Sequence, residues 1–222
     1  AAIAAEVGTV EDGTAASEER LGGRGRVPSS GVISELPPTG LELIGGRPTW
    51  GQAATDNPMR AVTRAAAFEP DGWTPQRRAE VVSLFDSLAP EWNERDVPER
   101  KVTIVDALER GLAAAPEARR SVAIELGGGT GLNRSTLASR FETLITIDIS
   151  PEMLALVPDG TIPVLGDGSR LALPDGSVDA LLLINMFLFP AEADRVVSPD
   201  GVVVWVSSRG PETPIYLAAD RR

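Results

Sequence analysis

Ten residues numbered 124 to 133, with the sequence IELGGGTGLN, carry the strongest chemical signal in this chain of 222 residues. Glycines stand at positions 127, 129 and 131, directly after an apolar run that contains Glu125. Glycine permits a tight turn and lets a ligand approach the backbone closely. A carboxylate inside an apolar run is costly unless it has a polar partner. The stretch therefore predicts a binding loop for a small molecule, with Glu125 close to it.

The composition excludes several kinds of chemistry. The chain has no His and no Cys, which removes imidazole bases, cysteine nucleophiles, disulfides and most zinc sites, so we expect no metal centre. Lys101 is the single lysine and lies in PERKVT, outside any glycine loop, which excludes a Walker-type phosphate site. The net charge of −11 argues against a nucleic-acid partner, because phosphate contacts need a basic face.

The same sequence lacks signals for membrane insertion or export. No apolar run approaches the roughly 20 residues that span a bilayer, and no basic-then-apolar signal opens the chain. The lack of cysteine fits a reducing compartment. We expect a cytoplasmic protein with a small-molecule substrate and no membrane partner.

The chain divides into three regions by composition. Residues 1–58 are rich in Gly, Ala, Ser and Pro and predict an irregular extension, with short strands near 32–36 and 41–44. Its GGRGR segment is interpreted as a flexible linker rather than an RNA-binding element, since it occurs once in an acidic chain. Residues 59–120 predict a helical cap region, and residues 121–222 predict the core domain.

Two helices are expected in the cap region. Thr74 is a favourable N-cap and Pro75 suits the first helical position. The next apolar residues recur at helical spacing until Pro90, namely Val81, Phe85, Leu88 and Ala89. A second helix over about 98–114 is expected to bury Val102, Val105, Leu108 and Leu112 on one side.

From Ser121 onward, short apolar runs alternate with turn signals and helical segments. The runs are SVAIEL, TLITIDI, IPVLGD, VDALLLIN and GVVVWVSS, and helices are expected at about 134–141 and 151–157. Runs that are apolar almost throughout are typical of strands covered on both faces. The alternation predicts an α/β fold with a mostly parallel sheet and helices on both faces.

The glycine spacing distinguishes between cofactors. The nicotinamide fingerprint GxGxxG fails, because Leu132 and Arg134 stand where its last glycine is required. The pattern ELGGGTG, with an acidic residue two positions before the first glycine, resembles motif I of the class I S-adenosylmethionine-dependent methyltransferases. The resemblance is to the small-molecule type, similar to methyltransferase domains 11 and 25, and it implies a Rossmann-like fold.

Further residues in the same order extend this resemblance over 121–208. Asp148, at the end of TLITID and 17 residues after Gly131, matches the family's acidic residue that holds the ribose hydroxyls. The following PEML is typical of the family's next helix. Asp167 falls where the family often has an acid near the adenine amino group, although GDGS is also an ordinary turn sequence. Asn185 falls where cofactor and substrate meet, or is a plain strand-end amide.

The resemblance implies a cofactor, a set of binding residues and two lid or substrate candidates. The cofactor is S-adenosylmethionine, with S-adenosylhomocysteine as product. The lid or substrate candidates are Trp92 and Phe187, and Trp92 could instead pack on the domain surface. The implied cofactor-binding residues are Glu125, Gly127, Gly128, Gly129, Thr130, Gly131, Asp148, Ile149, Met153, Asp167, Gly168 and Asn185.

The function implied is methyl transfer to a small-molecule acceptor by direct displacement. A sulfonium methyl group is already activated, so positioning and exclusion of water are the main tasks of the protein. Any general base would be Asp, Glu, Tyr216 or the substrate itself, and we name no catalytic residue. The alternative is a methyltransferase-fold protein that binds the cofactor or serves as a scaffold without transfer. A dehydrogenase is disfavoured by the glycine spacing.

The chain departs from the family pattern after Ser208. The family's sheet ends in two antiparallel strands, whereas only RGPETPIYLAADRR remains here. We expect these strands to be missing or shortened, with three explanations open: the N-terminal extension covers the edge, the chain is truncated, or a partner completes the sheet. Four tryptophans and the uncovered edge also leave room for a homodimer.

Overall fold

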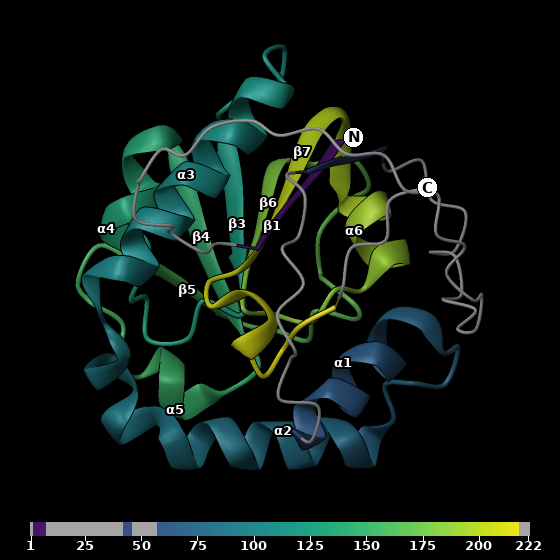
Figure 1. The fold of residues 1–222 in the computed structure, drawn as a ribbon, viewed down its shortest axis with the longest axis vertical. Helices are drawn as coiled ribbons and strands as arrows, with labels where there is room; N and C mark the ends of the chain where they lie inside the picture. Colours follow the sequence, from purple (N-terminus) through teal and green to yellow (C-terminus); the bar gives the residue numbers. More distant parts are fainter. Residues whose placement is uncertain (1, 8–41, 46–56, 218–222) are drawn as a thin grey trace, which may run out of the picture.

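The structure is a computed structural model that describes residues 2–7, 42–45 and 57–217, with side chains described for 57–217. Its strands form one seven-stranded sheet in the order β2-β1-β7-β6-β3-β4-β5 (Figure 1). Every pairing between these strands is parallel. The predicted α/β fold with a parallel sheet is confirmed.

The strands are short and most helices follow the predicted positions. The strands are β1 Ala2–Val7, β2 Glu42–Gly45, β3 Val122–Leu126, β4 Thr143–Asp148, β5 Ile162–Leu165, β6 Val178–Ile184 and β7 Val197–Ser207. The α-helices are α1 Pro58–Phe68, α2 Pro75–Leu88, α3 Pro98–Ala114, α4 Arg134–Leu137, α5 Pro151–Leu154 and α6 Pro190–Val196, and the 3₁₀ turns are η1 Ala89–Arg95, η2 Ala138–Arg140 and η3 Gly210–Glu212. No helix in the described part of the chain is both long and apolar enough to cross a membrane.

The core has one layer on each face of the sheet, because successive strand side chains point to opposite faces. On one face Leu182 of β6 packs with α3 and with Leu137 of α4. On the other face Leu181 and Leu183 pack with Trp205 of β7 and with the α6 side chains. Strand β6 is buried along its whole length, which explains why its sequence is apolar almost throughout. Helices on both faces were predicted and are confirmed.

Helix α3 buries a face one residue away from the predicted one. Leu108 and Leu112 are buried as expected, but Val102 is 58% exposed, while Thr103 and Ile104 lie inside. The predicted stripe counted only aliphatic residues, whereas the sheet surface accepts Thr103 because its hydroxyl donates to the carbonyl of Glu99 at 3.2 Å. The prediction for Val102 was wrong.

The sheet edge beyond β7 is completed by the N-terminal strands. Strand β1 pairs in parallel with β7 from Ala2↔Val202 to Val7↔Ser207, and β2 pairs in parallel with β1. No strand follows β7 in the described residues, as expected, and the N-terminal extension covers the edge. The expectation of an irregular extension was wrong for Ala2–Val7, and the strand expected near 41–44 is found as β2. The strand expected near 32–36 lies outside the described residues.

Helices α1 and α2 lie across the carboxyl end of the sheet, and α5 lies beside them (Figure 1). The N-terminus of α2 forms as predicted, since the Thr74 hydroxyl accepts a hydrogen bond from the Arg77 amide at 3.1 Å. In open α/β sheets ligands bind beyond the carboxyl ends of the strands. The arrangement encloses that region between the sheet and α1 and α2.

The core predicts a strong difference between two leucines. Leu182, in the central strand β6, is 1% exposed, and its replacement by Ala should lower the free energy of unfolding by about 3 kcal/mol because it leaves a cavity. Leu165, in edge strand β5, is 63% exposed, so Leu165→Ala should cost less than about 0.5 kcal/mol. Urea denaturation of both variants checks this. Equal losses would contradict the assigned layers.

Candidate functional site

The glycine loop leaves the inner strand β3 and turns sharply beneath the cap helices. Gly127, Gly129 and Gly131 have φ of 70°, 57° and 74°, a region that other residues rarely adopt. A Cβ atom on Gly128 would come within 2.5 Å of the Thr146 side chain, so this position needs glycine for packing. The Gly127 amide donates to the Ile147 carbonyl at 2.7 Å and ties the loop to β4. The run of glycines has a local structural cause at each position.

Glu125 lies directly under this loop, in the middle of the sheet. Its side chain is 1% exposed, and Oε1 accepts a hydrogen bond from Asn133 Nδ2 at 3.0 Å, while Oε2 is buried without a partner. Burial raises the pKa of Glu125 to about 7; the Asn133 hydrogen bond lowers it, and repulsion from Asp148 adds to the rise. A cation above the loop would stabilise the ionised form of this carboxyl.

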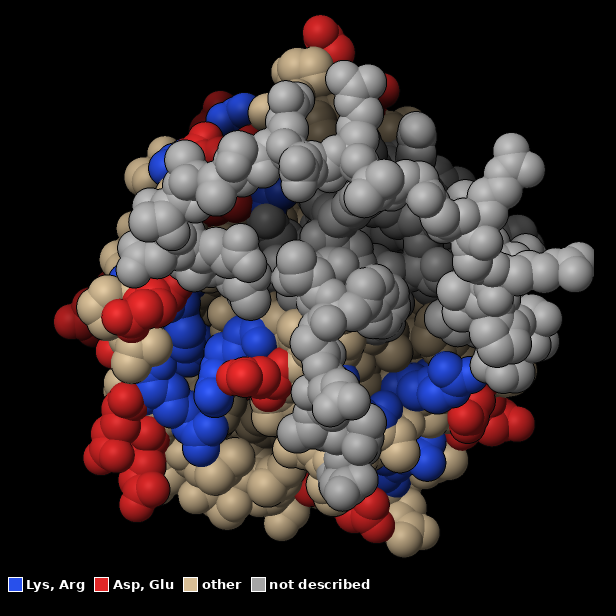
Figure 2. Space-filling view, in the orientation of Figure 1, with Lys and Arg blue, Asp and Glu red and all other residues tan. Residues whose placement is uncertain are grey.

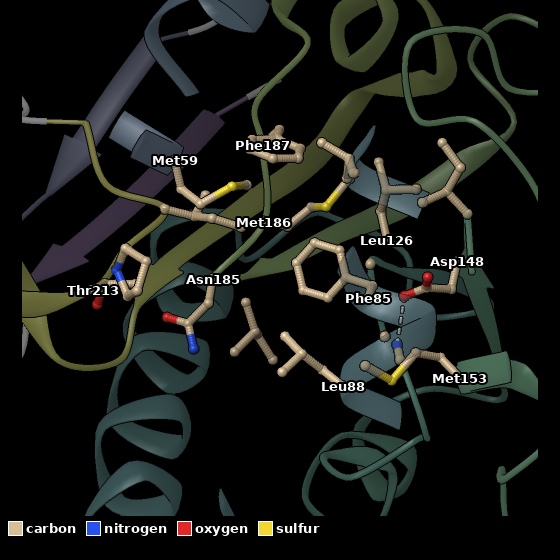
Figure 3. A pocket seen from close by; sticks show the side chains of 18 of the residues that line it. Met59, Phe85, Leu88, Leu126, Asp148, Met153, Asn185, Met186, Phe187 and Thr213 are labelled. Carbon is tan, nitrogen blue, oxygen red and sulfur yellow. Dashed lines mark hydrogen bonds between the residues drawn. The ribbon is translucent and has the colours of Figure 1, made fainter. Parts of the chain in front are cut away.

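Asp148 ends β4 beside the loop, 8% exposed (Figure 3). Its Oδ2 accepts from the Gly129 amide at 2.7 Å and its Oδ1 accepts from the Ser150 amide at 2.8 Å. Burial raises its pKa, and these backbone hydrogen bonds act in the opposite direction. Ser150 caps α5 by accepting from the Met153 amide at 3.1 Å, so Asp148 is not needed for that task. Each Asp148 oxygen keeps acceptor capacity for a ligand hydroxyl.

These groups open onto one cavity of about 790 Å³. In Figure 3 Asp148 and Met153 lie at one end of it, and Met59, Asn185 and Thr213 lie at the other. Of the residues predicted for the site, those that line the cavity are Trp92, Gly127, Gly128, Gly129, Asp148, Ile149, Met153, Gly168, Asn185 and Phe187. The predicted residues that do not line it are Glu125, Thr130, Gly131 and Asp167.

Thr130 and Gly131 shape the loop from outside the cavity. The Thr130 hydroxyl is hydrogen bonded to Asn93 Oδ1 at 2.6 Å, which connects the loop to η1. The Gly131 amide donates to the Gly128 carbonyl at 3.0 Å and closes the turn. Their predicted contact with a cofactor stays a prediction.

Asp167 is held by the cap region. Trp73 Nε1 lies 3.0 Å from Oδ1 and 3.2 Å from Oδ2, the Ser169 amide donates to Oδ1 at 2.9 Å, and Arg78 lies 3.6 Å from Oδ2. The carboxylate thus anchors the start of α2 to the loop after β5, and Gly166 and Gly168 on either side reach the cavity. The adenine role expected for Asp167 stays a prediction. Trp73 was missed, because its partner is distant in the sequence.

Asn185 stands at the end of β6 in a strained conformation. Its φ of 53° makes it the one non-glycine residue with positive φ among the described residues. Its Nδ2 donates to Ser208 Oγ and its Oδ1 accepts from the Ser208 amide, both at 2.8 Å. A strained residue held by its surroundings is typical of functional sites. The side chain joins the ends of β6 and β7 where both meet the cavity.

Two aromatic groups close the cavity from the cap side. Phe187 is buried and packs against Trp73, with ring centroids 5.4 Å apart. Trp92 packs edge-on against Phe85 at 5.7 Å, and its Nε1 would lie 3.4 Å from a Cβ on Gly129. Trp92 therefore lies next to the glycine loop rather than on a remote surface. Both positions suit the lid role expected from the sequence.

The helix after the loop is shorter than expected. A helix was expected over 134–141, but α4 has four residues and is followed by the η2 turn. The side chain of Asn133 bonds to Glu125 rather than capping α4. Any ligand here therefore meets the backbone of the loop, and the N-terminus of a long helix plays no part.

The residues present fit a nucleoside cofactor that carries an amino-acid tail. Asp148 has acceptors for two hydroxyl groups, Ile149 and Met153 offer apolar surface, and the orphaned Oε2 of Glu125 suits a cationic group above the loop. A parallel sheet with a glycine loop after an inner strand and a carboxylate after the next strand is the arrangement of a Rossmann-like nucleotide-binding fold.

Comparison with known proteins supports the resemblance found in the sequence. Residues 124–205 match the family model described as a methyltransferase domain. This match agrees with the class I S-adenosylmethionine-dependent methyltransferase resemblance of the same residues. The chain is 29% identical over 156 residues to a malonyl-[acyl-carrier protein] O-methyltransferase of Dechloromonas aromatica, covering 67% of this chain and 57% of that protein.

Other known proteins are similar to this chain over smaller parts of its length. An uncharacterized methyltransferase of Mycobacterium tuberculosis is 36% identical over 96 residues, 39% of either chain. The solved DhpI–SAH complex is 24% identical, with a TM-score of 0.47 over 57% of this chain and 66% of that one. The chain thus spans less than three fifths of the length of these two curated relatives.

The buried carboxyl of Glu125 predicts a pH dependence of stability. Its pKa is about 7 in the folded protein, against 4.5 without the fold, so the folded state holds the proton more tightly. The resulting stabilisation is complete below pH 4.5 and is lost as the pH rises to about 7, by roughly 3 kcal/mol. Glu125→Gln should remove this part of the pH dependence and be the more stable protein at pH 8.

Urea denaturation between pH 4.5 and 8 measures the effect. Asp148 is present in both proteins, so the difference between their curves measures Glu125 together with its repulsion by Asp148. Glu152→Gln, at an exposed position in α5, is the matched control and should follow the parent protein. Parallel curves for the parent and Glu125→Gln would disprove the assignment.

Proposed function

We propose that this protein transfers the methyl group of S-adenosylmethionine to a small-molecule acceptor by direct displacement. One observation carries the proposal: a single cavity connects the glycine loop and Asp148 to a second end at Asn185 and Thr213, where an acceptor has room. Small-molecule pockets measure about 300–1,000 Å³, so about 790 Å³ lies in the upper part of this range. The relatives named as methyltransferases support the reaction class.

In this proposal the chain positions the two reactants and keeps water away. Asp148 would hold the ribose hydroxyls, and the backbone of Gly127 and Gly129 would lie along the cofactor. The cofactor supplies an activated methyl group, so correct alignment of the acceptor provides most of the acceleration. Trp92 and Phe187 would cover the cavity from the cap side and exclude water.

The lining of the cavity limits the kind of acceptor. Among the described residues that line it, Asp148 is the one carboxylate, and two backbone amides already bind it. Tyr216 does not line the cavity, and burial raises its pKa further. The described residues therefore provide no free general base. The acceptor atom should carry a lone pair at neutral pH without losing a proton to the protein.

Cofactor binding tests the proposal by calorimetry. S-adenosylmethionine and S-adenosylhomocysteine should bind, and NAD should not. Asp148→Ala should weaken binding about 10- to 100-fold, because hydrogen bonds to a charged group contribute about 1.5–3 kcal/mol. Asp200→Ala, at an exposed position in β7, removes the same charge far from the cavity and should change nothing. No binding to the parent protein would overturn the proposal.

Turnover separates transfer from the alternative of a cofactor-binding scaffold. Methyl transfer from labelled S-adenosylmethionine to any member of a small-molecule panel supports an enzyme, and binding without transfer supports the scaffold.

The cytoplasmic location and the homodimer expected from the sequence stay predictions. Edge strand β5, which exposes Ile162, Val164 and Leu165, would be the surface for a homodimer.

A further inference from the structure

Part of the cavity lining is basic although the whole chain is acidic. Three arginines line the cavity, Arg95 at the end of η1, Arg100 in the first turn of α3 and Arg209 just after β7. Arg209 follows Ser208, whose side chain is hydrogen bonded to Asn185 at the acceptor end. Figure 2 shows Lys and Arg atoms in two groups above α2, with Asp and Glu atoms among them. Asp148 is the one acidic residue among the described lining residues. With a net charge of −11, such a local excess of arginine calls for a physical reason.

Arg100 is the centre of this group. Its Nε is buried without a hydrogen-bond partner, and its Nη1 donates to the Arg95 carbonyl at 2.9 Å. Burial lowers the pKa of Arg100; Asp96 acts in the opposite direction, and the positive charges of Arg95 and Arg209 lower the pKa further. Arg95 and Arg209 are thus both close enough to Arg100 for their positive charges to act on it. A half-buried arginine whose Nε–H has no hydrogen-bond partner can donate that hydrogen bond to a bound anion.

The neighbouring acids offset the positive charge of this group only in part. Asp96 is hydrogen bonded to Lys101 at 2.8 Å. Glu212 lies 3.6 Å from Arg209, with both side chains more than half exposed, so this pair is weak. Arg95 stacks on Trp92, with its guanidinium carbon 4.7 Å from the ring centroid. Neither Arg95 nor Arg100 makes an ion pair with any residue that the structure describes.

The walls beside these arginines are apolar. Leu84 and Leu88 of α2, Val97 before α3, and Pro214 and Ile215 after η3 line the same cavity. Arginine forms two parallel hydrogen bonds with a carboxylate or a phosphate, and the apolar walls suit a hydrocarbon body. The site thus matches a molecule with an anionic group at one end and an apolar remainder.

We propose that Arg100 and Arg209 form an anion subsite at the acceptor end of the cavity, which selects an acceptor with an apolar body and a carboxylate or phosphate group. This inference rests on the proposed methyl transfer and specifies its substrate class. Arg95 assists from its position on Trp92. Asp148, the one acidic residue among the described lining residues, belongs to the proposed cofactor site, so the two subsites differ in charge.

Octanoate and octanamide test the subsite, because they share a chain and differ in charge. Calorimetry measures both with the full chain saturated with S-adenosylhomocysteine, and again without it. The parent protein should bind octanoate about tenfold more tightly than octanamide, equivalent to about 1.4 kcal/mol. Arg100→Gln with Arg209→Gln should abolish the preference, and Arg100→Lys with Arg209→Lys should retain part of it.

A matched control removes two charges elsewhere. Arg119→Gln with Arg120→Gln lies at exposed positions outside the cavity and should keep the full preference for octanoate. Unchanged binding of S-adenosylhomocysteine by Arg100→Gln with Arg209→Gln would show that the variant is folded. Equal or undetectable binding of the two probes by the parent protein would overturn the proposal.

The cofactor also carries a carboxylate, and a third ligand distinguishes this source. 5′-Methylthioadenosine lacks the amino-acid tail. If Arg100→Gln with Arg209→Gln weakens S-adenosylhomocysteine but not 5′-methylthioadenosine, the arginines hold the cofactor, and the acceptor subsite is disproved. If the parent protein fails to bind S-adenosylhomocysteine, the proposed function fails. The preference for octanoate over octanamide, measured in the absence of S-adenosylhomocysteine, then still tests the anion subsite.

Discussion

The hydrogen bond from the Gly129 amide to the Asp148 carboxylate joins the ends of two neighbouring strands, and the cavity depends on it. It fixes the glycine loop, in which Gly127, Gly129 and Gly131 have positive φ angles. It also orients the Asp148 carboxylate. Glu125 beneath the loop is buried because the loop covers it. This hydrogen bond thus positions the glycine loop and the Asp148 carboxylate, and the loop in turn covers the Glu125 carboxyl.

The sheet supplies the rigid frame for this contact. Strand β6 lies between β3 and β7 and is buried on both faces, so the loop and Asn185 stand on elements that cannot shift independently. The N-terminal strands β1 and β2 extend the sheet at the edge where the sequence resemblance implied two antiparallel strands. Because β1 pairs with β7 and not with β3 or β4, this edge is separate from the strands that carry the glycine loop and Asp148.

The cavity combines two electrostatic environments within an acidic protein. Asp148, whose pKa is raised by burial, is the one carboxylate among the described residues that line the cavity, and three arginines line it as well. The net charge of the chain bears on its solubility and on broad classes of partner, but it does not show how charges are distributed within the cavity. The local distribution determines which ligand each end attracts.

The sequence by itself determined the parallel α/β fold, the cap on α2 and the positions of the glycine loop, Glu125 and Asp148. These features depend on local patterns: apolar runs of strand length, a Thr–Pro helix start, and glycines that follow a strand. Tertiary structure alone decided that β1 completes the sheet, that Trp73 holds Asp167, that α3 turns Thr103 rather than Val102 toward the core, and that Arg209 lines the same cavity as Arg95 and Arg100. These features depend on how elements that are distant in the chain pack together in the folded protein, which no local period or spacing records.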